Sequence, residues 1–198
     1  MRVILASKSP RRREILSMLG VKFDVLSADA DEHSDITDPA QLVRELSLRK
    51  GRAVRELLKA EGAWDMETLI IASDTVVAAN GEILGKPQDN ADAARMLRLL
   101  SGSAHHVVSG VALLTGDREI TDAEKTAVRF TTMSEKDIKW YVKSGEPADK
   151  AGAYAVQGLA SLFIEGLDGD YFNVVGLPVH RLELLLQEFL HLSLIDLA

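Results

Sequence analysis

The sequence predicts an α/β fold, a mixed β-sheet with flanking helices. Apolar runs with the two-residue periodicity of strands alternate along the chain with segments whose apolar residues recur every three or four positions. Turn signals such as Asn80-Gly81 predict at least two hairpins, which require antiparallel neighbours in the sheet. Alternating strands and helices combined with hairpins indicate a mixed sheet. For 198 residues without an internal repeat, we expect one domain or two closely packed lobes.

The segment 69–77 is the strongest strand prediction, and it carries one carboxylate in its middle. Alternation places Asp74 on one face of the strand and Thr75 on the other. If both faces are covered, an unpaired Asp74 would cost several kcal/mol, so a cationic partner is expected. The alternative is a strand that ends near Ser73 and leaves Asp74 as a solvated turn residue.

A basic cluster follows the first predicted strand, residues 2–6. Ser9-Pro10 as N-cap and first helical residue, with Gly20 as a stop, predict a helix over residues 10–19. Arg11–Arg13 then fall in its first turn, where the helix dipole disfavours cations and unpaired N–H groups point outward. The cluster therefore indicates anion binding; three solvated arginines on a surface helix are the alternative.

An acidic loop, residues 29–33, follows a second predicted strand over 21–27. Its carboxylates, Glu32 in particular, are oxygen ligands of the kind that Mg²⁺ and Mn²⁺ prefer. The alternative is a loop that is merely solvated.

A long helix is predicted to begin at Asp38-Pro39 and to run to about Lys59. Lys50 lies four residues from both Leu46 and Val54, so it projects from the apolar face of this helix. From that face Lys50 is a candidate cation for a site; the alternative is a side chain that extends to solvent along the edge of the apolar stripe.

The Asn80-Gly81 turn predicts a return strand that begins at Ile83 and ends at Gly85-Lys86-Pro87. Such a hairpin would bring Lys86 back beside the start of the strand that bears Asp74.

The rest of the chain continues the alternation, and a polar, turn-rich loop over 145–152 carries Lys150. The expected elements are a helix over 89–100, strands over 106–114 and 119–130, a helix from Ser134 to Gly145, strands over 153–157 and 161–165, a turn at 168–170, and a last helix opened by Pro178 with a frayed tail.

Composition excludes several classes of protein. The absence of cysteine excludes disulfides, thiolate metal sites and thiol catalysis, and is compatible with a reducing, cytoplasmic location. No apolar segment approaches the roughly 20 residues that span a bilayer, and the N-terminal apolar run is too short for a signal peptide, so no membrane association is expected. A net charge of −7 disfavours a nucleic-acid binder, whereas the local basic cluster favours a small anionic ligand.

Phosphoryl chemistry matches the charged residues that remain. It needs cations for the phosphate oxygens, oxygen ligands for a divalent metal and a group that positions or deprotonates water. No Walker-type or dinucleotide-type glycine loop and no Gly-x-Ser-x-Gly motif is present, and the scattered histidines disfavour a zinc site. The candidates are the cations Arg11, Arg12, Lys50, Lys86 and Lys150 and the carboxylates Glu32 and Asp74.

Five motifs stand in order along the chain. They are Leu5-Ala6-Ser7-Lys8-Ser9-Pro10-Arg11-Arg12, Ala72-Ser73-Asp74-Thr75-Val76-Val77, Gly85-Lys86-Pro87, the long loop from Gly145-Glu146-Pro147 through Asp149-Lys150-Ala151-Gly152 to Gln157-Gly158, and Asn173-Val174-Val175-Gly176-Leu177-Pro178. Together they resemble the Maf family of nucleoside triphosphate pyrophosphatases over essentially the whole chain, and the long loop is the most specific of them.

The resemblance implies an elongated sheet of the inosine-triphosphate-pyrophosphatase-like (Maf/Ham1) type. One Maf-like domain over residues 1–198 would have two lobes around an active-site cleft and would commonly form a homodimer. Members hydrolyse a nucleoside triphosphate between the α and β phosphates, giving a monophosphate and pyrophosphate with a divalent cation, Mg²⁺ or Mn²⁺.

The resemblance also implies roles for single residues. Asp74 would accept the proton of the attacking water, with Lys50 and Lys86 as further catalytic residues. The remaining roles are base discrimination by Arg11, Thr75 and Gln157, phosphate binding by Ser7, Arg12 and Lys150, and metal binding by Glu32 and Asp74. The discriminating residues resemble the subgroup acting on dTTP and UTP, which implies removal of non-canonical or modified pyrimidine nucleotides. Lys8, His33 and Ser109 depart from the family pattern without removing a required group.

A second hypothesis is a nucleotide-binding regulator of cell division and septum formation without significant catalysis. The joint presence of Asp74, Glu32 and the three lysines argues against lost catalysis. Because Thr75 and Asp74 face opposite sides of an ideal strand, a shared site would require the strand to end or bend there.

Overall fold

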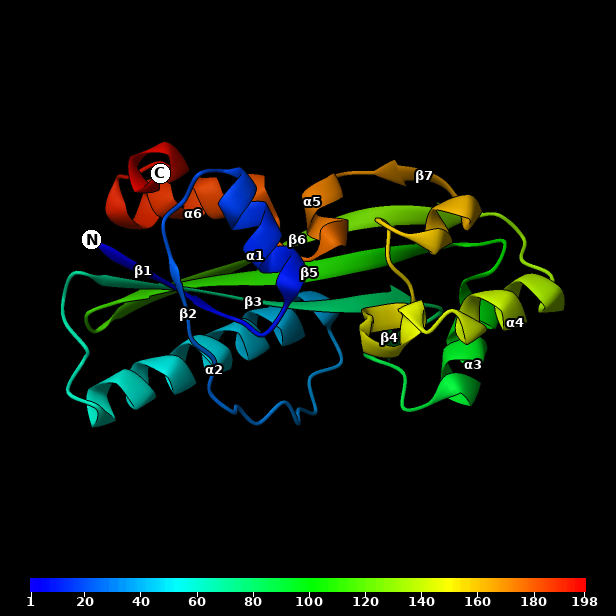
Figure 1. Cartoon of the computed structure of the whole chain (residues 1–198), viewed down its shortest axis with the longest axis horizontal. Helices are drawn as coiled ribbons and strands as arrows, with labels where there is room; N and C mark the ends of the chain where they lie inside the picture. Colours follow the sequence, from blue (N-terminus) through cyan, green and yellow to red (C-terminus); the bar gives the residue numbers. More distant parts are fainter. The chain divides into compact units, whose positions relative to one another are not determined.

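The computed structural model describes residues 1–198 and shows a seven-stranded mixed sheet with helices beside it (Figure 1). The strand order is β2-β1-β3-β5-β6-β7, and β4 pairs with the end of β3. Strand β1 is parallel to β2 and β3, whereas the β3–β4 and β6–β7 pairs are antiparallel. The predicted α/β class with a mixed sheet is confirmed.

The strands are β1 (Arg2–Ala6), β2 (Asp24–Val25), β3 (Thr68–Ala79), β4 (Glu82–Leu84), β5 (Ala104–Thr115), β6 (Arg118–Phe130) and β7 (Ile164–Asp168). The α-helices are α1 (Pro10–Met18), α2 (Pro39–Ala60), α3 (Asn90–Leu100), α4 (Glu135–Lys143), α5 (Tyr171–Val175) and α6 (Val179–Leu190). Four 3₁₀ helices complete the chain: η1 (Glu146–Asp149), η2 (Ala151–Ala153), η3 (Leu159–Phe163) and η4 (Leu194–Leu197). No helix is both long enough and apolar enough to cross a membrane.

The chain divides into two compact units. Unit 1 comprises Met1–Asp74, Ser109–Glu124 and Gly176–Ala198, and unit 2 comprises Thr75–Val108 and Lys125–Val175. Strands β3, β5 and β6 each run from one unit into the other, and the division in β3 falls between Asp74 and Thr75.

Helix α2 covers one face of the sheet in unit 1 (Figure 1). Its Val54 packs in a buried cluster with Ile4 of β1 and residues of β3 and β5. The contact is close: a Cβ atom on Gly110 of β5 would lie 2.2 Å from the carbonyl oxygen of Val43 in α2. Only glycine lets strand and helix approach in this way, so the register of α2 against the sheet is tightly fixed.

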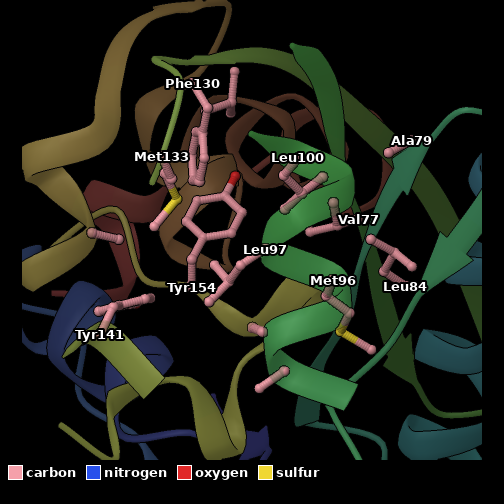
Figure 2. Packing of buried hydrophobic residues seen from close by; sticks show 14 of the residues in the cluster. Val77, Ala79, Leu84, Met96, Leu97, Leu100, Phe130, Met133, Tyr141 and Tyr154 are labelled. Carbon is pink, nitrogen blue, oxygen red and sulfur yellow. The ribbon is translucent and has the colours of Figure 1, made fainter. Parts of the chain in front are cut away.

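Unit 2 has its own core, in which aromatic rings meet edge to face (Figure 2). Phe130 and Tyr154 lie with ring centroids 4.8 Å apart, and His105 packs against both of them. The His105 Nε2 atom lies 2.8 Å from the Tyr154 hydroxyl. Burial lowers the pKa of His105 to about 4, so this imidazole is neutral at neutral pH.

The strand predicted over residues 153–157 is wrong. Gly152 and Ala153 have φ angles of 67° and 61°, within the 3₁₀ segment η2, and the residues that follow join no strand. A positive φ breaks an extended chain, and nothing in the sequence marks Ala153 for that conformation. The next strand is also displaced: η3 occupies most of 161–165, and β7 extends to Asp168.

Two further expectations at the edges of unit 1 are wrong. The second strand keeps only Asp24–Val25 of the predicted 21–27, and both residues are exposed at the sheet edge, where little apolar burial stabilises a longer strand. The C-terminal tail is ordered as η4, because Ser193 and Asp196 form a capping box and Leu194 and Leu197 are buried.

The buried neutral His105 predicts a loss of stability in acid. Between pH 6.5 and about 4, His105 is protonated in the unfolded chain but not in the folded protein. The free energy of unfolding therefore falls as the pH is lowered through that window. The full effect is about 3 kcal/mol. We expect His105→Gln, which cannot take up this proton, to lose less stability than the wild type in urea titrations across this range. The same substitution at the exposed His33 is the control, and equal pH dependence of His105→Gln and wild type would contradict the prediction.

Candidate active site

Asp74 lies inside a continuous strand and is only 9% exposed, so the alternative of a solvated turn residue is wrong. A cationic partner is present, as expected, and it is Lys50, whose Nζ donates to Asp74 Oδ1. Lys50 projects from the covered face of α2, as its spacing from the core positions predicts, and it ends on a carboxylate instead of in solvent. The pair removes the cost of an isolated buried charge.

Glu32 meets the same ammonium group. Its Oε1 atom lies 2.9 Å from Lys50 Nζ, although the Glu32 side chain is 65% exposed and comes from the irregular loop between β2 and α2. Arg49, the preceding residue of α2, donates from one guanidinium nitrogen to the carbonyl oxygens of Asp31 at 3.3 Å and His33 at 2.7 Å. Two successive residues of one helix therefore bind the backbone on both sides of Glu32 and its carboxylate.

Arg12 is a buried cation that ties three segments of unit 1 together. Its Nε donates to the Gly176 carbonyl oxygen at 2.8 Å, and one terminal nitrogen donates to the Ser73 carbonyl oxygen at 2.6 Å and to Ser7 Oγ at 3.3 Å. Burial lowers the pKa of Arg12, and the carboxylate of Asp74 partly offsets that effect. The guanidinium stays charged at neutral pH, so a positive charge is fixed at the backbone of Ser73, directly before Asp74.

The start of α1 differs from the predicted cap. Ser9 occupies the N-cap position with an extended backbone, but its side chain makes no capping hydrogen bond. Instead, Ser7 Oγ accepts from the Ser9 N–H at 3.1 Å. Arg11 stands half-exposed in the first turn.

Lys86 and Lys150 belong to unit 2, and one backbone contact brings their segments together. The Gly152 N–H donates to the Gly85 carbonyl oxygen at 3.0 Å, which holds the loop after α4 against the end of the β3–β4 hairpin. Lys86 is exposed, and Lys150 Nζ pairs with Asp149. Any ligand of Lys150 would therefore have to compete with that carboxylate.

The expected return of Lys86 to the start of β3 is wrong. The β3–β4 pairing covers only Val77 to Ala79, the last part of β3, and β4 ends at Leu84. A return strand of three residues is too short to reach further. Strand β3 also does not end at Thr75, which is half-buried and followed by four more strand residues.

The predicted site residues are thus distributed over both units. Unit 1 brings together Asp74, Lys50 and Glu32, with Arg12 and Ser7 bonded to each other nearby and Arg11 in the first turn of α1. Thr75, Lys86, Lys150 and Gln157 belong to unit 2, where Gln157 is exposed.

Sequence reasoning missed Arg49, Tyr141 and Glu146 as residues that hold the site segments. Arg49 has a weak sequence signal, since Glu45 lies four residues earlier and accepts from its Nε at 2.7 Å. Glu146 accepts from the Tyr141 hydroxyl at 2.8 Å and from backbone N–H groups after Gln157. Contacts to a distant backbone leave no periodic pattern that a single sequence would reveal.

The carboxylates of Glu32 and Asp74 are the residues that could hold a metal ion. Both place an oxygen against the same point, the Lys50 ammonium group. No group of three or more acidic, histidine or cysteine side chains could hold a metal by itself. Two carboxylates nevertheless fit Mg²⁺, which commonly uses one or two protein carboxylates and completes its shell with phosphate oxygens and water.

The role of Arg12 predicts a stability loss on substitution. Arg12→Met keeps the unbranched stem of the side chain but leaves the buried carbonyl oxygens of Ser73 and Gly176 without these donors. We expect the free energy of unfolding to fall by about 2 to 4 kcal/mol in urea denaturation. Arg13→Met, at an exposed position in the same turn, is the control and should be nearly neutral. Equal stability of the two variants would show that the Arg12 contacts contribute nothing net.

The chain is similar to several known proteins. The solved structure of the Staphylococcus aureus Ham1 protein aligns with a TM-score of 0.48 and 14% identity, over 66% of this chain and 72% of that one. A protein of Symbiobacterium thermophilum named dTTP/UTP pyrophosphatase is 49% identical over 94% of this chain and 93% of the relative. Proteins of the same name from Alkaliphilus oremlandii and Thermosipho africanus are 43% and 42% identical, over 98% and 91% of this chain and 98% and 90% of theirs. The family model described as Maf-like protein matches residues 2–189, and the chain belongs to the Maf family.

Proposed function

We propose that this chain is a nucleoside triphosphate pyrophosphatase that hydrolyses dTTP and UTP to the monophosphate and pyrophosphate. The observation that carries the proposal is the carboxylate of Asp74, which an otherwise apolar strand retains at a buried position against Lys50. Relatives over nearly the full chain bear the name of this activity. The alternative of a non-catalytic regulator of cell division is not favoured.

In the proposed reaction Asp74 accepts a proton from a water molecule that attacks the α-phosphorus. A bond forms between the water oxygen and the α-phosphorus, the bond from that phosphorus to the bridging oxygen breaks, and pyrophosphate leaves. Lys50 holds the Asp74 carboxylate in one position through the ion pair, which orients the proton acceptor before substrate arrives. The positive charge of Lys50 also offsets the repulsion between this carboxylate and an approaching triphosphate.

Arg12, Lys86 and Lys150 are assigned to the phosphates because they stand in the sequence motifs that resemble those of the family. Arg12 contributes a buried, fixed positive charge, and Ser7 contributes a hydroxyl bonded to it. Lys86 and Lys150 lie on segments joined by the Gly152–Gly85 hydrogen bond. Their ammonium groups suit the charge that accumulates on the leaving pyrophosphate.

A divalent cation, Mg²⁺ or Mn²⁺, is proposed at the carboxylates of Glu32 and Asp74. When bound it would neutralise phosphate oxygens and polarise the reacting phosphoryl group. Arg49 contributes by binding the backbone on both sides of Glu32, so this carboxylate is presented by a braced loop despite its exposure. The cytoplasmic location and the homodimer stay predictions.

Base discrimination is assigned to Arg11, Thr75 and Gln157. Uracil and thymine share an edge with one N–H donor and carbonyl acceptors, and the Gln157 amide can both accept from and donate to such an edge. Cytosine presents the opposite pattern at two of these atoms, so one glutamine amide in a fixed orientation would separate the bases. Gln157 is exposed and thus accessible to a ligand.

Asp74→Asn is expected to bind dTTP but to lose turnover by about 10²- to 10⁴-fold, because the amide keeps the shape of the side chain and cannot accept the proton. Pyrophosphate release measures turnover, and equilibrium binding of dTTP measures affinity. The control Asp35→Asn changes an exposed carboxylate of unit 1 and should leave both quantities unchanged. Near-wild-type turnover of Asp74→Asn would refute the assigned role.

The substrate assignment predicts a ranking of nucleotides. Pyrophosphate release with dTTP, UTP, CTP and 7-methyl-GTP should be fastest for the first two, and it should require Mg²⁺ or Mn²⁺ in each case. Equal rates on all four nucleotides would reject the subgroup, and binding without any release would support the non-catalytic regulator instead.

A further inference from the structure

Gln157 lies in the middle of a short segment, residues 155–159, whose two ends are held by a pair of bonded side chains. At one end the Ala155 N–H donates to the Tyr141 hydroxyl at 3.3 Å. At the other end the Leu159 N–H donates to Glu146 Oε2 at 3.0 Å. The Tyr141 hydroxyl itself donates to Glu146 Oε1 at 2.8 Å, so the two side chains that hold the segment are also bonded to each other.

The carboxylate of Glu146 fits closely against the backbone beside Gln157. A Cβ atom on Gly158 would lie 2.5 Å and 2.6 Å from its two oxygens, so the residue after Gln157 must be glycine for this contact to exist. The Ala160 N–H adds a third donor at 3.4 Å. Gly158 has an extended backbone, so its lack of a side chain serves this approach and not an unusual φ angle.

The pair is itself rigidly placed in the core of unit 2. Tyr141 is fully buried on α4, and Figure 2 shows it among the side chains of the unit 2 core. Burial raises the pKa of Tyr141, with the Glu146 hydrogen bond acting in the same direction, so the hydroxyl keeps its proton. Upstream, Tyr154 is buried against Phe130 and His105. Residues 156–159 are therefore the stretch that is not buried between the buried Ala155 and Ala160, and the N–H group of its last residue is held by Glu146.

We propose that the Tyr141–Glu146 pair positions Gln157 and so determines base selectivity, although neither residue touches the nucleotide. The inference rests on the proposed function, because it takes Gln157 as the group that reads the pyrimidine edge. Recognition of the base by hydrogen bonds requires a defined orientation of the Gln157 amide. If the segment were free to move, selectivity between bases would fall before the rate of hydrolysis does. Asp74, its lysine Lys50 and Glu32 belong to the other unit, so the proton acceptor is not held by this pair.

The test compares Glu146→Ala, Glu146→Gln and Gln157→Ala with the wild type, using kcat/KM for UTP and for CTP. Glu146→Ala should lower the UTP-to-CTP ratio roughly tenfold, about the worth of one hydrogen bond, mainly through KM for UTP. Glu146→Gln should recover most of the ratio, since its amide can accept from the Leu159 N–H and donate to the Tyr141 hydroxyl. Glu165→Ala, an exposed carboxylate on β7, is the matched control.

A double variant distinguishes positioning from general weakening. If Glu146 acts through Gln157, adding Glu146→Ala to Gln157→Ala should change the ratio little further, whereas independent effects would multiply. Multiplied effects, or an unchanged ratio in Glu146→Ala, would overturn the inference.

Amide hydrogen exchange without nucleotide gives a readout that is independent of activity. Glu146→Ala should accelerate exchange at residues 155–160 and leave α2 and β1 as in the wild type. Unaltered exchange at 155–160 would overturn the inference even if the enzyme behaves as proposed. A wild type that releases no pyrophosphate from any nucleotide would refute the proposed function instead, and the exchange result would still decide whether the pair holds the segment.

Discussion

The structure of unit 1 depends on one ion pair, in which a carboxylate within an apolar strand is met by a lysine from the helix that covers it. The pair requires α2 to lie close to the sheet, and glycines make that approach possible. A Cβ atom on Gly51, directly after Lys50, would lie 2.3 Å from a methyl group of Leu114, and the contact at Gly110 is closer still. Lys50 thus reaches Asp74 from a helix that can neither lift away without separating the charges nor approach further without a clash.

The surrounding charges repeat this arrangement, in which a side chain near the reacting groups is held by another that does not react. Arg12 is bonded to the carbonyl oxygens of Ser73, directly before Asp74, and of the distant Gly176, and Arg49 is bonded to the backbone on both sides of Glu32. The Tyr141–Glu146 pair bears the same relation to Gln157. In each case a polar side chain fixes a segment by bonding to its backbone, and for the buried Arg12 an unpaired charge would also be costly.

Sequence reasoning succeeded where local chemistry decides the structure. Asp38-Pro39 marks the start of α2 because a carboxylate cap and a proline act within one turn, and Ser134 with Asp137 marks α4 in the same way. A cationic partner for Asp74 was expected from its place in an apolar strand, but the hairpin pointed to Lys86, whereas the structure pairs Asp74 with Lys50 of α2. The positive φ of Ala153, the short β4 and the ordered tail had no such signal. They depend on packing against residues far away in the sequence, as do the contacts of Arg49 and Glu146.

The division of the chain between Asp74 and Thr75 separates the acid from most of the residues assigned to the base. On the proposed roles, the proton acceptor, its lysine and the second carboxylate all belong to unit 1, whereas Thr75 and Gln157 belong to unit 2. Substitutions at the unit 2 residues that face the base can therefore alter which pyrimidine is accepted while the acid and its lysine stay as they are; Lys86 and Lys150, which serve the leaving pyrophosphate, share unit 2 with them. On the same roles, Arg11 is the one base-discriminating residue that belongs to the half of the chain that holds the acid.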